Sequence, residues 1–331
     1  MTKIIMAQSL MNKKFEAEQY LIEGLISRGD IGSIVGSSET GKSMLLRDMG
    51  ISVASGEEKF LGFKINRSSG VVVYISTEDG ERRTKETLDK QFIGRNIEKI
   101  NANLGFLFET DDIIKELNNL QVSRKIDLVI IDCFSDLFKG DLNRTNEVRA
   151  FLNPYKEFAR KNDSAIIFLH HIGKSGELKA PNKNNILGSQ GYESSMRFVA
   201  ELRKDKYDSD KRHFCITKAN GLPDKYKQSS LVLNFDPDKF TYTNTWESKK
   251  FSELADDSPR REDLEKYQKI VSLSREGVIQ SEIAKQVGYE AKSSVSKLLK
   301  KGQKENWDTL FSDLNKAKKL KLEDEIDELP F

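Results

Sequence analysis

The stretch Gly36-Ser-Ser-Glu-Thr-Gly-Lys-Ser43 decides the fold of this chain. It matches the pattern G-x-x-x-x-G-K-[ST], in which the backbone N–H groups of a glycine-rich turn surround a phosphate. Residues 30–35 form a short apolar run that predicts a buried strand, and residues 44–49 open a helical pattern. A strand, a glycine-rich loop and a helix N-terminus in this order predict an anion-binding site.

The same stretch supplies side chains suited to a nucleoside triphosphate and its metal ion. The Lys42 ammonium is expected to reach the β- and γ-phosphates, and the Ser43 hydroxyl is expected to bind Mg2+. A glycine-rich loop that arose by chance is the alternative, and the flanking strand and helix argue against it. The residues expected to bind ATP are Gly36, Ser37, Ser38, Glu39, Thr40, Gly41, Lys42, Ser43 and Met44.

The composition indicates a globular chain with room for one large domain and one small domain. It has 331 residues, of which 37% are hydrophobic and 32% are charged, with a net charge of +2. Cys133 and Cys215 lie in apolar runs without metal-ligand spacing, which predicts buried thiols. The sequence shows no signal-peptide pattern and no run long enough to span a bilayer, so we expect a cytoplasmic protein without a membrane partner.

Two further buried strands end in carboxylates. The apolar run 71–76 leads to Glu78 and Asp79, and the apolar run 126–132 ends in Asp132. The carboxyl ends of parallel strands meet at one edge of the sheet, where ligands bind. An apolar strand that ends in Asp downstream of a phosphate-binding loop predicts the carboxylate that holds Mg2+. An ordinary strand that happens to end in Asp is the alternative.

A strand predicted over residues 164–169 delivers His170 and His171 to the same edge. Adjacent side chains of a strand point to opposite faces, which disfavours a zinc site built from this pair. We predict instead that one histidine faces the γ-phosphate. The polar segment 175–187 is expected to be a mobile loop on the ligand edge. Three lysines in or next to this segment add positive charge to the edge, and a loop of solvated side chains is the alternative: Lys174, Lys179 and Lys183.

The remaining segments complete an α/β domain. Residues 81–122 predict helical segments around one short strand at 105–108, and residues 147–161 predict an amphipathic helix. Residues 188–201 are expected to form a further helix. Alternating apolar and polar residues predict antiparallel strands at 212–218, 229–235 and 239–245.

The order of these motifs resembles that of the RecA-like ATPases, and within them that of the RepA-type replicative helicases of plasmids. The resemblance covers about residues 15–245, and the matching segments are 21–26, 36–43, 55–62, 74–79, 131–132, 170–174, 188–189 and 218–221. It implies a RecA-like P-loop NTPase fold with a mostly parallel central sheet. It also implies a hexameric or related ring with ATP bound between subunits.

Several residue roles follow from this resemblance alone. Glu78 is implied as the base that polarises the attacking water, and His171 as the γ-phosphate sensor. The 175–187 loop is implied to line a channel and touch single-stranded DNA. Many relatives place Lys-x-Arg on a late strand as a finger that acts on the neighbouring subunit. Asn220 occupies the arginine position here, which leaves Lys218 or Arg212 for this role.

Beyond an expected N-terminal extension (1–19), ATPase domain (20–245) and linker (246–262), the sequence predicts a small all-α domain at 263–309. Its helical patterns and its apolar positions Ile283, Val287, Val295 and Leu298 resemble a helix-turn-helix. The last helix carries lysines and no acid, which favours binding to duplex DNA. A protein-docking bundle with a solvated basic face is the alternative. The lysines are Lys292, Lys297, Lys300 and Lys301.

Residues 310–331 form a charged tail with an acidic tip that ends in Leu329, Pro330 and Phe331. The tip resembles the carboxy-terminal end of bacterial single-stranded-DNA-binding proteins. This resemblance implies a protein partner with an apolar pocket and basic surroundings. A disordered solubilising tail is the alternative.

The sequence as a whole predicts an ATP-hydrolysing, Mg2+-dependent DNA-binding protein in which Lys42, Glu78, Asp132 and His171 carry catalysis. As a RepA-like helicase or translocase, it would act in replication or mobilisation of a plasmid or other mobile element. One alternative is an ATP-gated adaptor or loader for another DNA enzyme, such as a transposase or nuclease, which Asn220 and the acidic tail favour. Another is an ATP-dependent DNA-binding regulator, against which the paired acids at 78–79 argue.

Overall fold

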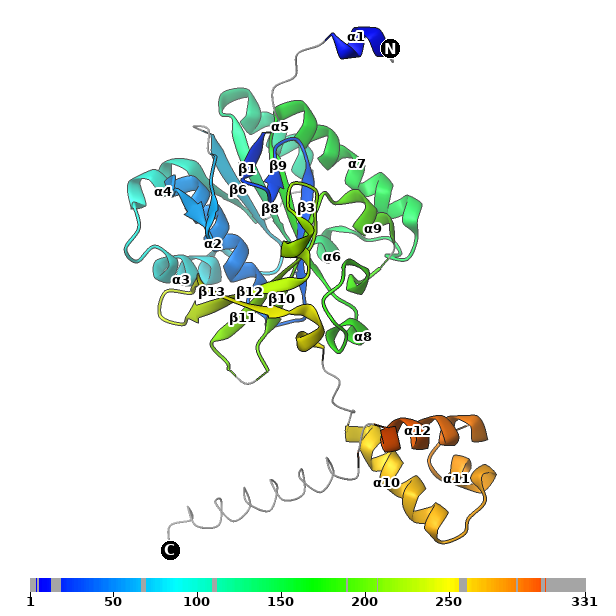
Figure 1. The fold of residues 1–331 in the computed structure, drawn as a ribbon. Coiled ribbons are helices and arrows are strands. Elements are labelled where there is room, and N and C mark those ends of the chain that lie inside the picture. The colour runs from blue at the N-terminus through cyan, green and yellow to red at the C-terminus, as the bar shows by residue number, and fades with distance from the viewer. Residues whose placement is uncertain are drawn as a thin grey trace, which may run out of the picture. The chain divides into compact units, whose positions relative to one another are not determined.

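The computed structural model describes residues 4, 6–12, 19–66, 70–108, 112–188, 190–206, 208–255, 261–289, 291–304 and 307. The chain divides into two compact units, residues 1–256 and residues 257–331. The helices and strands of the two units are labelled in Figure 1. Within the described ranges, no helix is long and apolar enough to cross a membrane.

A nine-stranded mixed sheet forms the centre of the first unit, in the order β13-β12-β11-β10-β3-β9-β8-β6-β7. The strands from β10 to β7 in this order run parallel to one another. They are β10 (Phe198–Lys204), β3 (Ile31–Gly36), β9 (Ala165–His171), β8 (Ile126–Asp132), β6 (Val71–Ser76) and β7 (Leu104–Leu107). The antiparallel strands are β11 (Lys211–Ala219), β12 (Ser229–Asp236) and β13 (Thr241–Lys250). The prediction of a mostly parallel α/β sheet is confirmed.

Helices cover both faces of this sheet (Figure 1). Helix α2 (Lys42–Ser55) buries Leu45, Leu46 and Met49 in the core cluster on one face. The core cluster on the other face includes residues of α5 (Ile113–Ser123), α7 (Thr145–Asn162) and α9 (Gln190–Ser195). Every residue of β3, β6 and β8 is buried. Burial on both faces explains why these strands have uninterrupted apolar sequences.

The first unit contains further helices and strands outside this sheet. The helical ones are α1 (Ala7–Met11), α3 (Glu81–Gln91), α4 (Ile97–Asn103), α6 (Phe134–Leu137), α8 (Lys174–Glu177), η1 (Lys183–Asn185), η2 (Asp224–Lys227) and η3 (Phe251–Leu254). The strands are β1 (Tyr20–Ile22), β2 (Ile26–Ser27), β4 (Lys59–Phe60) and β5 (Phe63–Lys64).

The prediction of one helix over residues 188–201 is wrong. Helix α9 ends at Ser195, and Phe198–Lys204 is strand β10, which pairs with both β3 and β11. A buried strand was not predicted over these residues because the run contains two charged residues. Glu201 and Arg203 are both buried and form an ion pair at 2.5 Å. Because each compensates the charge of the other, the strand lies inside the sheet.

The predicted linker at 246–262 begins too early. Strand β13 continues to Lys250, and η3 follows with Phe251 buried. Trp246 has φ 65° and lies where the register between β12 and β13 shifts. The charged residues after Trp246 therefore belong to an edge strand of the sheet. Charged side chains are typical of such edges because they oppose pairing with another chain.

The second unit contains α10 (Arg261–Arg275), α11 (Gln280–Gln286) and α12 (Lys292–Lys304). All three lie within the residues 263–309 predicted to be all-α, except for the first two residues of α10. Ile270, Ile283, Ala284, Val287 and Val295 form one small core, and Leu298 packs against it. Leu264, Tyr267 and Trp307 form a second cluster. The acidic tip with Leu329, Pro330 and Phe331 lies outside the described residues.

Candidate functional site

The loop between β3 and α2 is held in a tight curve. Glu39 has φ 59° and Gly41 has φ 92°, both in the left-handed region. Thr40 Oγ1 and Lys42 Nζ each donate a hydrogen bond to the Ser37 carbonyl, at 3.0 and 2.6 Å. The curve brings the first N–H groups of α2 to the carboxyl edge of the sheet. This conformation is the one that the glycine-rich motif predicts.

A cleft of about 630 Å³ opens beside this loop. Of the residues predicted from the sequence, it is lined by Ser38, Glu39, Gly41, Lys42, Ser43, Met44, Glu78, His171 and Arg212. Other residues complete the lining: Arg47, Asp79, Arg83, Thr87, Leu169, Phe235 and Tyr242. Gly36, Ser37 and Thr40 belong to the same loop, and Ser37 and Thr40 line a neighbouring cleft. The cleft is thus built from segments more than a hundred residues apart.

The Asp132 carboxylate is buried at the end of β8 with one oxygen unpaired. The Tyr74 hydroxyl donates to Oδ2 at 2.5 Å, whereas Oδ1 has no hydrogen-bond partner among the described residues. Burial raises the pKa of the Asp132 carboxyl, and hydrogen bonds from Tyr74 and Ser43 oppose that rise. A buried, unpaired carboxylate oxygen beside a serine hydroxyl fits the hard oxygen ligands that Mg2+ prefers. Asp132 and Ser43 therefore suit the predicted metal role.

Lys42 contributes positive charge at the phosphate-binding loop, and three arginines also line the cleft: Arg47, Arg83 and Arg212. Burial lowers the pKa of the Lys42 ammonium group, and the carboxylates of Asp132 and Glu78 oppose that effect. The side chain is 5% exposed and donates to a backbone carbonyl of the loop. A buried cation held against an N–H-rich loop favours a polyanionic ligand.

Glu78, Cys133 and His171 come together at the carboxyl ends of three strands. Cys133 Sγ lies 3.2 Å from Glu78 Oε1, to which it donates, and 3.1 Å from Ser135 Oγ. The ligand atoms of Glu78, Cys133 and His171 all lie within 4.8 Å of one another. Cys133 and Cys215 are both buried free thiols, as predicted. The contact between Cys133 and Glu78 was not predicted, because it joins the ends of two different strands.

The two histidines have different environments. His171 is half-buried and lines the cleft, whereas His170 is fully buried and its Nε2 lies 2.9 Å from the Leu187 carbonyl oxygen. Burial lowers the pKa of His170 to about 4 and also lowers the pKa of His171. Of the two histidines, His171 is therefore the one that lines the cleft, while His170 is a core residue.

Two residues near the loop were missed by the sequence interpretation. Tyr242, on β13, donates from its hydroxyl to the Gly41 carbonyl at 3.2 Å. Arg47, on α2, is buried beside Asp79 at 3.5 Å and lies 5.3 Å from the centre of the Tyr74 ring. Arg47 lies one helical turn after the glycine-rich motif, and this spacing could have identified it from the sequence. Tyr242 carried no local signal, since about 200 residues separate it from the loop.

Arg212 and Lys218 lie at opposite ends of β11. Arg212 Nε donates to the carbonyl of Thr40, in the phosphate-binding loop of the same chain, at 3.0 Å. Arg212 therefore stabilises that loop within its own subunit. Lys218 pairs with Val199 at the far edge of the sheet and forms an ion pair with Glu193 at 2.8 Å. The separation is about 20 Å at 3.3 Å per residue. The contact made by Arg212 does not fit a residue that acts on a neighbouring subunit.

The 175–187 segment has more fixed contacts than the mobile loop that was expected. The guanidinium of Arg203 donates to the carbonyls of Gly176 and Glu177, and Asn185 Nδ2 donates to the Ala180 carbonyl. Lys179 is exposed, and Lys183 forms an ion pair with Glu193 at 3.4 Å. The side chain of Lys174 lies outside the described residues. These contacts hold the segment near the carboxyl edge of the sheet.

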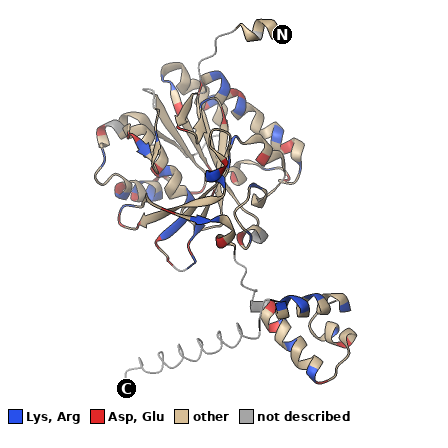
Figure 2. Ribbon diagram, in the orientation of Figure 1, with Lys and Arg blue, Asp and Glu red and all other residues tan. Residues whose placement is uncertain are grey.

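Helix α12 presents a basic surface in the second unit (Figure 2). Four exposed lysines contribute to it, and no ion pair neutralises them within the described part of the chain. Lys301 Nζ also lies 5.5 Å from the centre of the Trp307 ring. The four are Lys292, Lys297, Lys300 and Lys301.

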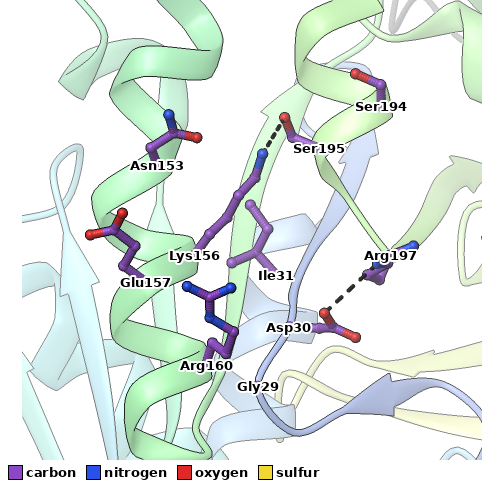
Figure 3. Close-up of a pocket in the computed structure, with 10 residues that line it drawn as sticks. All are labelled: Gly29, Asp30, Ile31, Asn153, Lys156, Glu157, Arg160, Ser194, Ser195 and Arg197. Atoms are coloured by element: carbon purple, nitrogen blue, oxygen red, sulfur yellow. Dashed lines mark hydrogen bonds and ion pairs between the residues drawn. The ribbon is translucent and has the colours of Figure 1, made fainter. Parts of the chain in front are cut away.

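A second cleft of about 500 Å³ lies at the amino edge of the same sheet (Figure 3). Lys156 points toward Ser195 and donates to its hydroxyl at 2.8 Å, and Arg197 lies 3.8 Å from Asp30. Arg160 and Glu157 extend from the same face of the cleft. None of the residues predicted to handle a nucleotide lines it. The predicted nucleotide-binding residues that line a cleft therefore lie at the carboxyl edge of the sheet.

Comparisons with known proteins agree with this geometry. The family model described as an AAA domain matches residues 6–177. A solved structure of a DnaB-like replicative helicase, studied with its interactions with primase, shares the fold with a TM-score of 0.50 and 15% sequence identity. The match covers 66% of this chain and 57% of that chain, so this chain spans little more than half of its length. No match to a curated protein was found.

Proposed function

This chain belongs to the AAA domain family, and from that membership we propose that it is a Mg2+-dependent ATPase that acts on DNA. The observation that carries the proposal is the unpaired buried Oδ1 of Asp132, next to Ser43 and beside the Lys42 ammonium. A loop of this conformation binds phosphates, and an adjacent carboxylate oxygen without a partner suits a bound cation.

The proposed division of labour follows the positions of the side chains. Lys42 and the loop N–H groups bind the β- and γ-phosphates, while Asp132 and Ser43 hold Mg2+. When bound, Mg2+ neutralises charge on the phosphate oxygens. His171 faces the terminal phosphate from β9. Glu78 accepts the proton of the attacking water, because it is an exposed carboxylate that lines the cleft.

A Glu78→Gln variant tests the assignment of the base. It removes the proton acceptor but keeps the shape of the side chain, so we expect ATP binding to persist and turnover to fall by about 100-fold or more. Glu81→Gln is the matched control, since Glu81 is an acid in the first turn of α3 that does not line the cleft. Wild-type turnover in the Glu78→Gln enzyme would remove Glu78 from the mechanism.

We further propose that Lys218 acts in trans in a hexameric or related ring. It lies at the edge of the sheet away from its own nucleotide cleft, and Arg212 is engaged in cis. Lys42→Ala and Lys218→Ala subunits should each be inactive alone. Mixing them should restore turnover, because one type of interface then combines an intact Lys42 with an intact Lys218. Absence of restoration in mixed oligomers would argue against the trans role.

The DNA contacts are proposed for two places. Lys174, Lys179 and Lys183, in or next to the 175–187 segment, are proposed to contact single-stranded DNA. The lysines of α12 are proposed to contact duplex DNA as part of a helix-turn-helix. The motif order favours a RepA-type helicase or translocase of a plasmid or other mobile element. The tip with Leu329, Pro330 and Phe331 is proposed to bind a protein partner.

ATPase rates with and without DNA, at two salt concentrations, test the function as a whole. Single-stranded DNA should stimulate turnover, and the effect should weaken at the higher salt concentration because phosphate contacts release counterions. No ATP hydrolysis under any of these conditions would overturn the proposal. Stimulation by duplex DNA alone would reject translocation on single strands.

An ATP-gated adaptor for another DNA enzyme is the second candidate. The engagement of Arg212 with its own loop, together with Asn220 at the finger position, favours it. A strand-displacement assay separates the two candidates. A helicase displaces an annealed strand by itself, whereas an adaptor hydrolyses ATP without displacing one.

A further inference from the structure

Three side chains with metal-binding atoms meet where β6, β8 and β9 end. Glu78 follows β6, Cys133 follows β8 and His171 is the last residue of β9. Their ligand atoms lie within 4.8 Å of one another, and Cys133 Sγ is already 3.2 Å from Glu78 Oε1. This cluster uses different ligand atoms from the oxygen pair of Asp132 and Ser43. Its three residues are far apart in the sequence, so the fold brings them together.

The donor set identifies the class of metal. Mg2+ prefers oxygen ligands, whereas a thiolate, an imidazole and a carboxylate together suit zinc. Three protein ligands with a fourth position open to solvent or substrate are typical of accessible zinc sites. Glu78 and His171 both line the cleft, so the fourth position of such a site would face the cleft.

The geometry requires only a small adjustment. Zinc bonds of about 2.0–2.3 Å in a tetrahedron place the donor atoms roughly 3.3–3.8 Å apart. The exposed Glu78 side chain is able to move to such a separation from the other two donor atoms. Within the described residues, only the Cys133 thiol is hydrogen-bonded to it. The Lys42 ammonium opposes a cation here, while the carboxylates of Asp132 and Asp136 favour one.

We propose that Glu78, Cys133 and His171 bind a zinc ion, and that this ion stops ATP hydrolysis. On binding, the S–H bond of Cys133 breaks, a bond from sulfur to the metal forms, and the proton passes to solvent. The metal then binds the Glu78 carboxylate and the His171 imidazole, so these two groups no longer take part in hydrolysis. The inhibition rests on the proposed function, because it assumes that these two groups serve hydrolysis. The metal site itself does not depend on that assumption.

Titration of the chelator-treated, full-length protein with Co2+ in excess Mg2+ tests the site directly. Thiolate coordination should produce sulfur-to-cobalt charge-transfer absorption that saturates at one equivalent, and zinc should displace it. Cys133→Ser should abolish this absorption, and Cys215→Ser should keep it. Cys215 is the matched control because it is also a buried free thiol, on β11, where it donates to the His213 carbonyl. No absorption, or absorption that survives Cys133→Ser, would overturn the site.

A second variant guards against loss of folding in Cys133→Ser. His171→Gln changes a half-buried residue at the cleft surface and should weaken Co2+ binding at least 10-fold while the protein stays folded. Unchanged Co2+ affinity in this variant would exclude His171 as a ligand and overturn the three-residue site.

The ATPase rate tests the inhibition separately. Saturating zinc should lower turnover to the level of Glu78→Gln, and a chelator should restore it. Unchanged turnover with the cobalt band present would reject the inhibition and leave the metal site standing. Absence of hydrolysis in the metal-free protein with Mg2+ would instead reject the proposed function, and the cobalt spectra would still decide the site.

Discussion

Tyr74 and Asp132 share a 2.5 Å hydrogen bond that joins the middle of β6 to the end of β8. Both groups are buried, and the bond uses Oδ2 of the carboxylate, which leaves Oδ1 without a partner among the described residues. The phenol therefore orients the carboxylate and fixes which oxygen is available. Removal of the Tyr74 hydroxyl should therefore change the properties of the Asp132 carboxylate.

Tyr74→Phe should weaken Mg2+ binding and lower the stability of the protein. Without the hydroxyl, Oδ2 of this buried carboxylate loses the hydrogen bond from Tyr74, which raises the pKa of Asp132 further and costs about 1–3 kcal/mol. We expect a higher Mg2+ concentration at half-maximal ATPase rate and a lower midpoint in urea. Tyr155→Phe is the control, because the Tyr155 hydroxyl makes no hydrogen bond within the described part of the chain. Equal effects of both substitutions would contradict the orienting role.

Gly41→Ala should disrupt the phosphate loop. The residue has φ 92°, and an added Cβ would lie 2.0 Å from the Tyr242 hydroxyl. The backbone strain alone costs about 1–2 kcal/mol. Addition of Tyr242→Phe should relieve the steric contact but leave that strain, so stability should recover in part while nucleotide binding stays weak. Gly80→Ala is the control, since nothing lies within 4 Å of the added atom. A neutral Gly41→Ala would show that the loop differs in solution.

His170 should make the first unit less stable in acid. Its pKa falls from 6.5 to about 4 in the folded protein, so between these values the unfolded state binds more protons. Stability from this residue is present above pH 6.5 and is lost as the pH falls toward about 4, by an amount on the order of 3 kcal/mol. His170→Gln removes this pH dependence while retaining a donor toward the Leu187 carbonyl.

The measurement is the difference in urea-unfolding free energy between the wild-type protein and His170→Gln across this pH range. The difference is needed because burial raises the pKa of Asp48 to about 6, which gives the opposite slope. A difference that does not change with pH would show that His170 is not held neutral by burial.

Replacement of three α12 lysines by glutamine should weaken binding to duplex DNA. Lys297, Lys300 and Lys301 are exposed, and removal of each phosphate-binding lysine should reduce the slope of log affinity against log salt by about 0.9. Fluorescence anisotropy at several salt concentrations measures this slope. Lys85→Gln is the control, because Lys85 lies on α3 and pairs with Asp89. An unchanged slope would favour a protein-docking role for the second unit.

Much of the fold could be predicted because its signals are local. The glycine-rich loop, the continuous apolar strands and the three C-terminal helices each depend on neighbouring residues in the sequence. Strand β10 could not be predicted in this way, since its burial depends on the ion pair between Glu201 and Arg203. The end of β13 was missed for a similar reason, because its polar residues belong to a sheet edge.

The candidate site also has some features that local sequence predicts and others that it does not. The sequence by itself determined that a phosphate loop, an acidic strand end and two histidines would share one edge, because parallel strands place their carboxyl ends together. Only the tertiary structure decided that Asp132 keeps one oxygen unpaired among the described residues, that Arg212 braces its own loop, and that Cys133 reaches Glu78. Each of these contacts joins residues far apart in the chain, and their partners are selected by packing of the sheet rather than by local pattern.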